Sequence, residues 1–467
     1  MGADTINERT LRRLRLRLGN RLVEPGDAAY EDARAVWNGM INRRPRLIGR
    51  CATADDVTAC IEFANENPLV VAVRGGGHNV AGHGTCDRGL VIDLSLMRNV
   101  RVEPSARVAH VEGGATWADV DAATQAYGLA TPGGVVSETG VAGLTLGGGL
   151  GHLRSLYGLA CDNLRAADVI TADGRRLRAA ENQNEDLLWG LRGGGGNFGV
   201  VTSFEFALHP LGPGVMFLAV FHDGELAEDA LRLYRDFSAE APDELSTIAF
   251  LGQVPPGHEA FPPDAHGLPF VAFVGVYAGP VDEGKRVVQP LRNFAEPLAD
   301  FSGPAAYTQA QRFFDEEYPA RRMRYYWKST NLVRLDDEAI RRIVEHGLRQ
   351  PSPNSTTDLW NISGAVKKLG NGSSAFPGRD AAFVLNPEAN WTRPVDDAAN
   401  VAWVRDFVAA MEPWSDGGRY LNFAGFQEEG DAMMRAAFGP HFARLVELKR
   451  KYDPSNLFRL NQNIAPA

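Results

Sequence analysis

Glycine residues gather in three clusters between residues 74 and 199. The first cluster is residues 74–79, the second is 143–151 and the third is 192–199. Because glycine has no Cβ, backbone N–H groups at such positions can approach a phosphate closely. The clusters therefore indicate one extended phosphate-bearing ligand, such as a dinucleotide. The alternative interpretation is three unrelated tight turns.

Two familiar nucleotide motifs fit this sequence poorly. The third cluster matches G-x-G-x-x-G, but residues 200–206 alternate like a strand where a Rossmann site needs a helix. Residues 279–285 fit G-x4-G-K, but Arg286 stands where a magnesium-binding Ser or Thr must be. The sequence therefore favours neither a Rossmann site nor a P-loop.

The elements that must position these clusters change character along the chain. Before about residue 212, helices expected at 55–65 and 117–127 alternate with short strands such as 69–73 and 89–94. After it, the glycine clusters stop, and aromatic strand-like runs alternate with helical stretches. The second part is expected to be an α+β unit with its own sheet.

Composition excludes several classes of protein. The chain has 467 residues, enough for two or three structural units. Its 44% hydrophobic and 23% charged residues are ordinary for a globular protein. A net charge of −10 argues against a nucleic-acid or anionic-membrane binder. The sequence contains no stretch of about 18 apolar residues, so no membrane span is predicted. Arg12-Arg13 resembles a twin-arginine signal, but no apolar region follows it, so the expected location is the cytoplasm.

Cysteine and histidine patterns predict no metal site. The four cysteines form no C-x-x-C pair and are too few for a disulfide scaffold. The ten histidines are scattered, and none lies in H-E-x-x-H.

The glycine clusters and their flanks carry a family resemblance. Residues 71–100, 140–164, 187–206 and 452–464 resemble the FAD-binding blocks of the vanillyl-alcohol oxidase superfamily, in its berberine-bridge-enzyme-like branch. The resemblance implies an α+β fold, with a two-subdomain FAD-binding domain and a substrate domain whose antiparallel sheet is covered by helices. The implied boundaries are 1–212, 213–414 and a C-terminal segment, 415–467, that returns to the FAD-binding domain.

The same resemblance implies FAD as the cofactor, bonded covalently through His78 to the flavin 8α-methyl group. It also implies a set of cofactor-binding residues, made of the cluster glycines and their polar neighbours. These are Arg74, Gly75, Gly76, Gly77, His78, Asn79, Gly82, His83, Gly140, Gly143, Thr145, Gly148, Gly149, Gly151, Asp162, Asn163, Gly196, Asn197, Gly199, Val201, Asn461, Gln462 and Asn463.

A single covalent bond is expected. Some relatives have a second bond, to a cysteine four residues before the glycine that here is Gly140, and this position is Val136. Cys161 lies 21 residues beyond Gly140, where the family has a small residue, and we expect it to be a small buried side chain.

Residues 420–423 resemble a Tyr-x-Asn-Tyr block in which a tyrosine often serves as base. Strand periodicity would put Tyr420 and Asn422 on one face, and both are predicted to be catalytic. A tyrosine has a pKa of about 10, so a base needs a lowered pKa or a concerted transfer. Phe423 replaces the second tyrosine, which puts simple alcohol oxidation in doubt, whereas a neutral amine needs no strong base.

The middle of the chain offers aromatic candidates for substrate contact. Alternation places Tyr326 and Lys328 on one strand face and Tyr325 and Trp327 on the other, one face toward the core and one toward a cavity. The residues predicted to contact a substrate are Tyr326, Lys328, Trp360 and Trp391. Their aromatic surplus predicts a substrate with a flat or apolar body.

The leading hypothesis is an FAD-dependent oxidase. It would take hydride from an alcohol or amine carbon of a small molecule, with O2 as electron acceptor and hydrogen peroxide as product. The alternatives are a flavin oxygenase of natural-product biosynthesis, a dehydrogenase with another acceptor, a non-catalytic flavin-binding protein and an NAD-dependent dehydrogenase.

Overall fold

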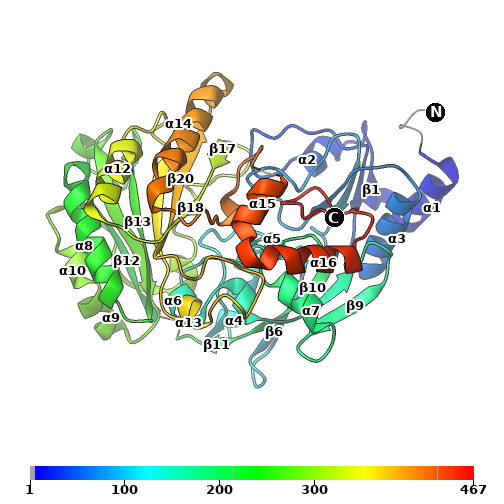
Figure 1. Cartoon of the computed structure of the whole chain (residues 1–467), viewed down its shortest axis with the longest axis horizontal. Coiled ribbons are helices and arrows are strands. Elements are labelled where there is room, and N and C mark those ends of the chain that lie inside the picture. Colours follow the sequence, from blue (N-terminus) through cyan, green and yellow to red (C-terminus); the bar gives the residue numbers. More distant parts are fainter. Residues whose placement is uncertain (1–5, 213, 429, 467) are drawn as a thin grey trace.

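The computed structural model of the protein describes residues 6–212, 214–428 and 430–466. Three larger sheets and the helices around them build the molecule, which confirms the predicted α+β class (Figure 1). No helix among these residues is long and apolar enough to cross a membrane.

The first sheet has four strands in the order β1-β2-β4-β3, with β2, β4 and β3 parallel. Helix α3 packs on it, and a capping box of Thr53 and Asp56 fixes where α3 begins. The chain before β2 contains two helices, a short strand and extended segments among the residues that the structure describes. The elements are α1 (Glu8–Leu18), β1 (Leu22–Val23), α2 (Tyr30–Arg34), β2 (Leu47–Arg50), α3 (Ala54–Asn65), β3 (Val71–Arg74) and β4 (Leu90–Asp93).

The second sheet is antiparallel, in the order β5-β6-β10-β8-β9. The third glycine cluster joins helix α7 to strand β10, so a strand follows the cluster, as predicted, and not a Rossmann helix. The elements are β5 (Val100–Glu103), β6 (Val108–Glu112), α4 (Trp117–Gln125), β7 (Leu129–Ala130), α5 (Val141–Leu146), α6 (Arg154–Tyr157), β8 (Leu164–Ile170), β9 (Arg176–Ala180), α7 (Glu185–Leu191), β10 (Val200–Ala207) and β11 (His209–Pro210).

The third sheet has nine strands, seven of them in the order β15-β12-β14-β13-β19-β20-β17. All of its pairings are antiparallel; β16 also pairs with β12, and β18 with β20. Its strands are β12 (Gly214–Asp223), β13 (Leu245–Gln253), β14 (Pro269–Tyr277), β15 (Pro297–Asp300), β16 (Gly303–Ala306), β17 (Arg324–Trp327), β18 (Thr330–Leu332), β19 (Thr356–Asn361) and β20 (Phe383–Trp391).

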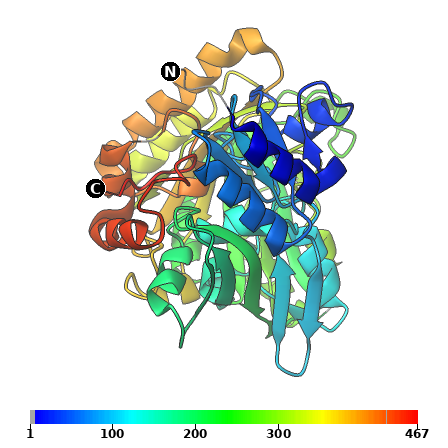
Figure 2. The same cartoon turned by 90° about the vertical axis from the view of Figure 1, so that its right-hand side faces the viewer.

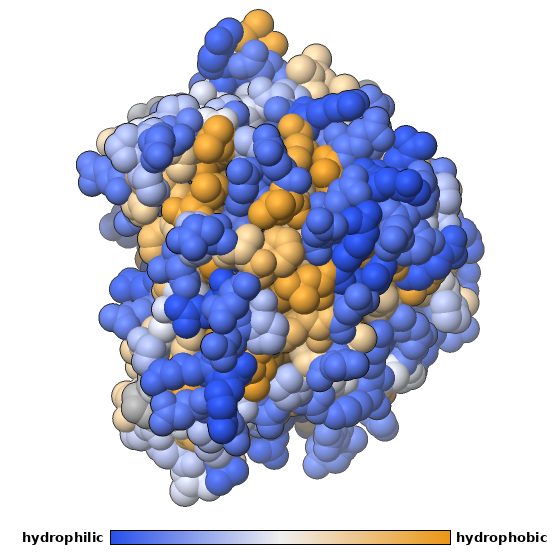
Figure 3. Space-filling model, turned by 90° about the vertical axis from the view of Figure 1, so that its left-hand side faces the viewer, coloured by the Kyte–Doolittle hydropathy of each residue, from blue (hydrophilic) through white to orange (hydrophobic). Residues whose placement is uncertain are grey.

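Helices cover the outer face of this sheet, and the inner face looks toward the rest of the chain (Figure 1). Partly buried Leu233, Phe237 and Val344 on the covering helices pack against the core beneath, and the helical face shows a band of hydrophobic surface (Figure 3). The remaining helices of this region are α8 (Ala227–Glu240), α9 (Val281–Val287), α10 (Gln289–Arg292), α11 (Tyr307–Ala310), α12 (Asp337–Gly347), α13 (Ala365–Lys368) and α14 (Asp397–Ala410).

The C-terminal segment returns to the second sheet, where its helices lie beside the strands (Figure 2). These helices are α15 (Asp431–Phe438) and α16 (Phe442–Tyr452). Gly439 has φ of 50° and Pro440 follows it, and together they end α15. The domain boundaries at 212 and 414 stay a prediction.

Candidate active site

A single cavity brings together loops from all three sheets and the C-terminal segment. Its walls come from the glycine clusters on one side and from the inner face of the third sheet on the other. Many of the predicted cofactor residues line it, namely Arg74, Gly75, Gly76, Gly77, His78, Asn79, His83, Gly140, Gly143, Gly196, Gly199, Val201, Asn461 and Gln462.

The first glycine cluster is the loop that leaves the carboxyl end of β3. Arg74 anchors it: Nε and Nη2 donate to Asp93 at the end of β4, at 3.1 and 2.8 Å. A Cβ added to Gly76 would lie 2.5 Å from the Cα of Gly140, so only glycine allows the first cluster to approach the residue that precedes α5 this closely. The loop is thereby fixed against the segment that begins α5.

His78 lies on this loop with its ring stacked on Trp37, at a centroid distance of 4.2 Å. Trp37 stacks in turn on Tyr325 of β17, at 3.7 Å. The Nε2 atom of His78 is buried and has no hydrogen-bond partner among the described residues. Burial lowers the pKa of His78 to about 4, so its imidazole is neutral at pH 7. A neutral ring nitrogen keeps its lone pair and is nucleophilic.

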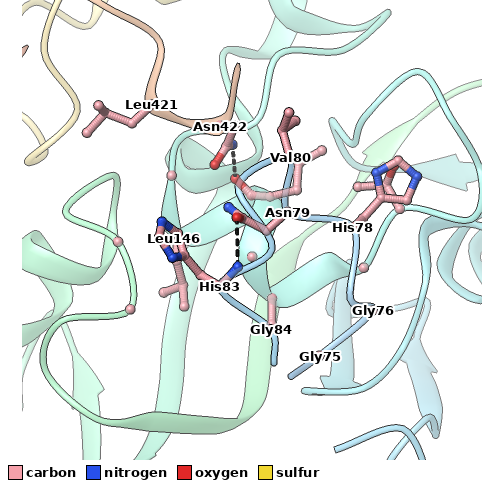
Figure 4. Close-up of a pocket in the computed structure, with 18 of the residues that line it drawn as sticks. Gly75, Gly76, His78, Asn79, Val80, His83, Gly84, Leu146, Leu421 and Asn422 are labelled. Carbon is pink, nitrogen blue, oxygen red and sulfur yellow. Dashed lines mark hydrogen bonds between the residues drawn. The ribbon is translucent and has the colours of Figure 1, made fainter. Parts of the chain in front are cut away.

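His83 has an environment similar to that of His78, but its side chain points in a different direction. It also lines the cavity, burial lowers its pKa to about 4, and its Nδ1 has no partner among the described residues. Its backbone N–H donates to Asn79 Oδ1 at 3.1 Å. The two imidazoles point to opposite sides of the loop (Figure 4).

Tyr420 and Asn422 meet in the cavity, although not on a strand as expected. Tyr420 precedes a short 3-10 turn, Leu421–Phe423. Its hydroxyl oxygen accepts hydrogen bonds from the N–H groups of Gly149 and Leu150, at 3.1 and 3.0 Å. Asn422 Nδ2 donates to the same oxygen at 2.9 Å and to Leu144 O at 3.0 Å. The 3-10 turn therefore brings the side chains of Tyr420 and Asn422 together, as the expected strand would have done.

The pKa of Tyr420 does not move in the direction that a base requires. Burial raises it to about 12, although the three donors partly oppose this shift. At neutral pH the hydroxyl is therefore protonated, and the three donors share the two lone pairs of its oxygen. Such a group can donate a hydrogen bond into the cavity.

Aromatic side chains form the end of the cavity next to the third sheet. The lining there includes Phe250, Phe314, Tyr318, Trp327, Trp360 and Phe423. Trp360 therefore lies where a substrate residue was expected. Trp327 and Tyr325, on the same strand face, belong to the core on the cavity side of the sheet.

Three predicted substrate residues lie elsewhere, and their prediction was wrong. Tyr326 and Trp391 are buried under the covering helices, on the opposite face of the sheet. Tyr326 donates to Glu428 at 2.7 Å, and Trp391 Nε1 donates to Asp397 at 2.8 Å. Lys328 forms an ion pair with Glu428 at 2.6 Å. The alternation on β17 was correct, but the face that meets the cavity was the other one.

Two acidic residues of the cavity wall were not predicted. Asp358 of β19 and Glu388 of β20 both line the aromatic end and are both about 2% exposed. Strand alternation was the signal that could have found Asp358, since it puts this residue on the same face as Trp360.

Several residues predicted to bind the cofactor instead bond to other residues of the protein. Asp162 forms a buried ion pair with Arg379, and Asn163 donates to two carbonyls of the preceding turn. Asn197 donates to Gly194 O at 2.9 Å and accepts from Ile464 N at 3.0 Å. The others that do not line the cavity are Gly82, Thr145, Gly148, Gly149, Gly151 and Asn463.

The site fits the FAD that the resemblance implies. A Cβ added to Gly143 or Gly196 would meet no atom within 4 Å, so at both positions bare backbone borders open space. Asn461 Oδ1 and His78 Nε2 are buried polar atoms left without partners among the described residues. These features are those of a cradle for a polar, phosphate-bearing molecule. The same described residues include no cluster of three metal-ligating side chains.

Two family models match the chain. Residues 45–180 match the FAD binding domain, and residues 419–465 match the family described as berberine and berberine like. An FAD-linked oxidoreductase, pgmH of Aspergillus terreus, is 30% identical, with 99% of this chain and 97% of the relative covered. The (R)-6-hydroxynicotine oxidase of Paenarthrobacter nicotinovorans is 28% identical, with 97% and 98% covered.

Solved structures share the fold over nearly the whole chain. The 6-hydroxy-D-nicotine oxidase of Arthrobacter nicotinovorans superposes with a TM-score of 0.84 at 26% identity, covering 96% of this chain and 98% of that chain. A chitooligosaccharide oxidase reaches 0.85 at 21% identity, covering 98% and 100%.

Proposed function

The chain belongs to the berberine-bridge-enzyme-like branch of the FAD-linked oxidoreductases, and on that premise we propose that it is an oxidase with a covalently bound flavin. It takes hydride from an alcohol or amine carbon of a small, aromatic or polycyclic molecule and uses O2 as acceptor, with hydrogen peroxide as product. One observation carries the proposal. A single cavity runs from the glycine clusters past a neutral His78 to an aromatic chamber beside Tyr420.

The glycine clusters hold the cofactor in this proposal. Backbone N–H groups of Gly75, Gly76 and Gly77 bind the pyrophosphate, and the second and third clusters line the rest of the dinucleotide. Gly143 and Gly196 border open space, which supports this role. FAD, when bound, supplies the hydride acceptor that no amino-acid side chain offers.

His78 forms the covalent bond in this proposal. Its buried Nε2 has no partner among the described residues, and its stack on Trp37 holds the ring in one orientation. The bond is single, because Val136 lines the cavity without a thiol. Cys161 is fully buried outside the lining, and burial raises the pKa of its thiol. A covalent bond prevents loss of the flavin and raises its potential.

Tyr420 and Asn422 act as a fixed polar pair at the reacting end. Three donors hold the Tyr420 oxygen in place, and its proton is free to hydrogen-bond with a bound substrate. With its pKa raised to about 12, Tyr420 is a donor and positioning group at neutral pH and not an ionised base.

A flavin oxygenase is the second candidate, and Phe423 is the observation that favours it. Phe423 packs edge-on against Tyr420 at a centroid distance of 4.7 Å and lines the cavity at the position where the resemblance implies a second tyrosine. Peroxide measured per substrate consumed separates the two candidates, because the oxygenase releases little. The cytoplasmic location also stays a prediction.

Acid precipitation of the purified protein tests the covalent flavin. The wild-type pellet is expected to stay yellow after washing, and the pellet of a His78→Ala variant is expected to be colourless. His83→Ala is the matched control. It removes a second buried, neutral imidazole from the same loop and cavity, and its pellet is expected to stay yellow.

Other outcomes contradict parts of the proposal. Release of all wild-type flavin into the acid supernatant contradicts the bond to His78 but leaves a non-covalent FAD enzyme. A colourless His83→Ala pellet beside a yellow His78→Ala pellet moves the bond to the other histidine.

A further inference from the structure

Two buried carboxyl groups lie next to each other on the cavity wall, at the aromatic end. In the register of the third sheet, Asp358 of β19 lies opposite Asn386 of β20, and Glu388 is two residues further along β20. Residues two apart on a strand share a face, so the two acids are diagonal neighbours on the face that lines the cavity.

The polar contacts of the pair come from neutral groups. Glu388 accepts a hydrogen bond from the Tyr318 hydroxyl at 2.7 Å and another from Asn386 Nδ2 at 2.6 Å. Asp358 accepts one from Thr356 Oγ1 at 3.0 Å. None of the ion pairs within the described residues includes either carboxyl.

The elements around the pair add no positive charge to it. The cross-strand neighbours on the cavity face are Phe250 of β13 beside Asp358 and Trp327 of β17 beside Glu388. The titratable groups that face the pair are the phenols of Tyr318 and Tyr325, and burial, with a smaller contribution from the charge of Glu388, raises the pKa of both. Arg154 lies 5.2 Å from the Trp360 ring, but it donates to Asn361 and to backbone carbonyls.

Burial favours the protonated, neutral form of both carboxyl groups. It raises the pKa of Asp358 to about 7, and it raises the pKa of Glu388 well above its ordinary value, with the charge of Asp358 adding to the rise. Near neutral pH the pair is thus close to losing a proton, in a chamber walled by aromatic rings. Ring faces and carboxylates both attract cations.

We propose that Asp358 and Glu388 form the binding site for the protonated nitrogen of an amine substrate and take up the proton of that nitrogen. This inference rests on the proposed function and narrows its substrate class from alcohol or amine to amine. Aromatic side chains hold the apolar body of the substrate, and the carboxyl pair holds its ammonium group.

The proton transfer balances within the pair. The N–H bond of the ammonium breaks, an O–H bond forms on a carboxylate of the pair, and the electron pair stays on nitrogen. The amine is then neutral, and its lone pair can support the loss of hydride from the neighbouring carbon. The pair thereby supplies the proton acceptor that Tyr420, with its raised pKa, does not.

Calorimetric titration with benzyltrimethylammonium tests this site. The probe carries a permanent charge and has no proton to lose, so any pH dependence of its binding comes from the protein. As pH rises past about 7, the pair loses its proton and becomes more negative. The affinity is expected to increase by about tenfold between about pH 6 and pH 8.5, while that of neutral benzyl alcohol stays constant.

Isosteric variants assign the effect to the pair. Asp358→Asn and Glu388→Gln are each expected to weaken binding of the cation at about pH 8.5 by about tenfold or more and to flatten its pH profile. Asp121→Asn is the matched control, because Asp121 is a buried carboxyl with its pKa raised to about 7, held by Gln311 outside the cavity lining. It is expected to bind the cation like the wild type.

Two results with the wild-type protein would overturn the inference. One is an affinity for the cation that does not increase with pH, and the other is an affinity no higher than that for benzyl alcohol. Neither result depends on whether a variant folds. The titration reads binding and not turnover. If the flavin is acid-stable but the affinity for the cation does not change with pH, only this inference is contradicted. If the protein holds no flavin, the proposed function itself is contradicted.

Discussion

At Tyr420 the residue type suggested a base, and its surroundings indicate a different role. The oxygen accepts from two backbone N–H groups and from Asn422, and burial raises its pKa to about 12. Sequence located this residue because the block around it is local. Its ionisation depends on burial by segments far away in the chain, which no local pattern contains.

Replacing Tyr420 with phenylalanine tests that role. The change leaves the N–H groups of Gly149 and Leu150 without an acceptor and removes the donor at the reacting end. Stopped-flow measurement of anaerobic flavin reduction is expected to show a rate about tenfold to a hundredfold lower. The pH profile between about pH 6 and pH 9 should keep its shape, because the Tyr420 hydroxyl does not ionise there. A break in the wild-type profile that disappears in the variant would instead identify a phenolate base.

Among the elements, β17 shows where sequence reasoning succeeds and where it ends. Alternation correctly separated Tyr326 from Tyr325 and Trp327. The choice of face failed because it depends on which side of the sheet the helices cover, and distant segments decide that. The capping box that begins α3, by contrast, is contained within four residues, and the helix that follows it was predicted.

The ion pair of Arg379 and Asp162 connects elements that are distant in sequence. Asp162 belongs to the short turn before β8, Arg379 precedes β20, and their side chains are 5% exposed or less. Arg379→Met leaves a buried carboxylate without its partner, and the free energy of unfolding is expected to fall by about 3–5 kcal/mol in urea titrations.

The double variant Arg379→Met with Asp162→Leu is the control for this pair. It buries no lone charge, so it is expected to recover part of the loss. A single variant as stable as the wild type would show that the pair contributes little to the connection.

The arrangement of the whole molecule could be predicted from the family resemblance, but not from the pattern of residue types along the chain. No periodicity reveals that three sheets and a returning C-terminal segment enclose one cavity, because those contacts join residues hundreds of positions apart, such as Asn422 and Leu144. The glycine clusters did predict one extended ligand, and their loops do line one cavity.

Buried histidines link the stability of the whole protein to pH. His152 is about 1% exposed, neither ring nitrogen has a partner among the described residues, and burial lowers its pKa to about 3. The unfolded chain binds a proton below about pH 6.5 and the folded chain does not, so stability falls as pH drops from there toward 3.

His152→Phe removes this contribution and keeps a ring beside Phe314. In urea unfolding at several pH values, its stability relative to the wild type is expected to rise by about 1.4 kcal/mol per pH unit below about pH 6.5. Parallel curves for His152→Phe and wild type would contradict the argument.

The buried Lys449 ties the end of the chain to the third glycine cluster. Its ammonium group donates to Asn197 O, Phe458 O and Asp453, and Asn461 donates to Gly196 O. During synthesis on the ribosome, this wall of the cavity is missing until residues 449–461 have emerged. The cofactor can therefore be enclosed only after translation has passed them, and a chain released too early exposes the glycine clusters with nothing to close over them.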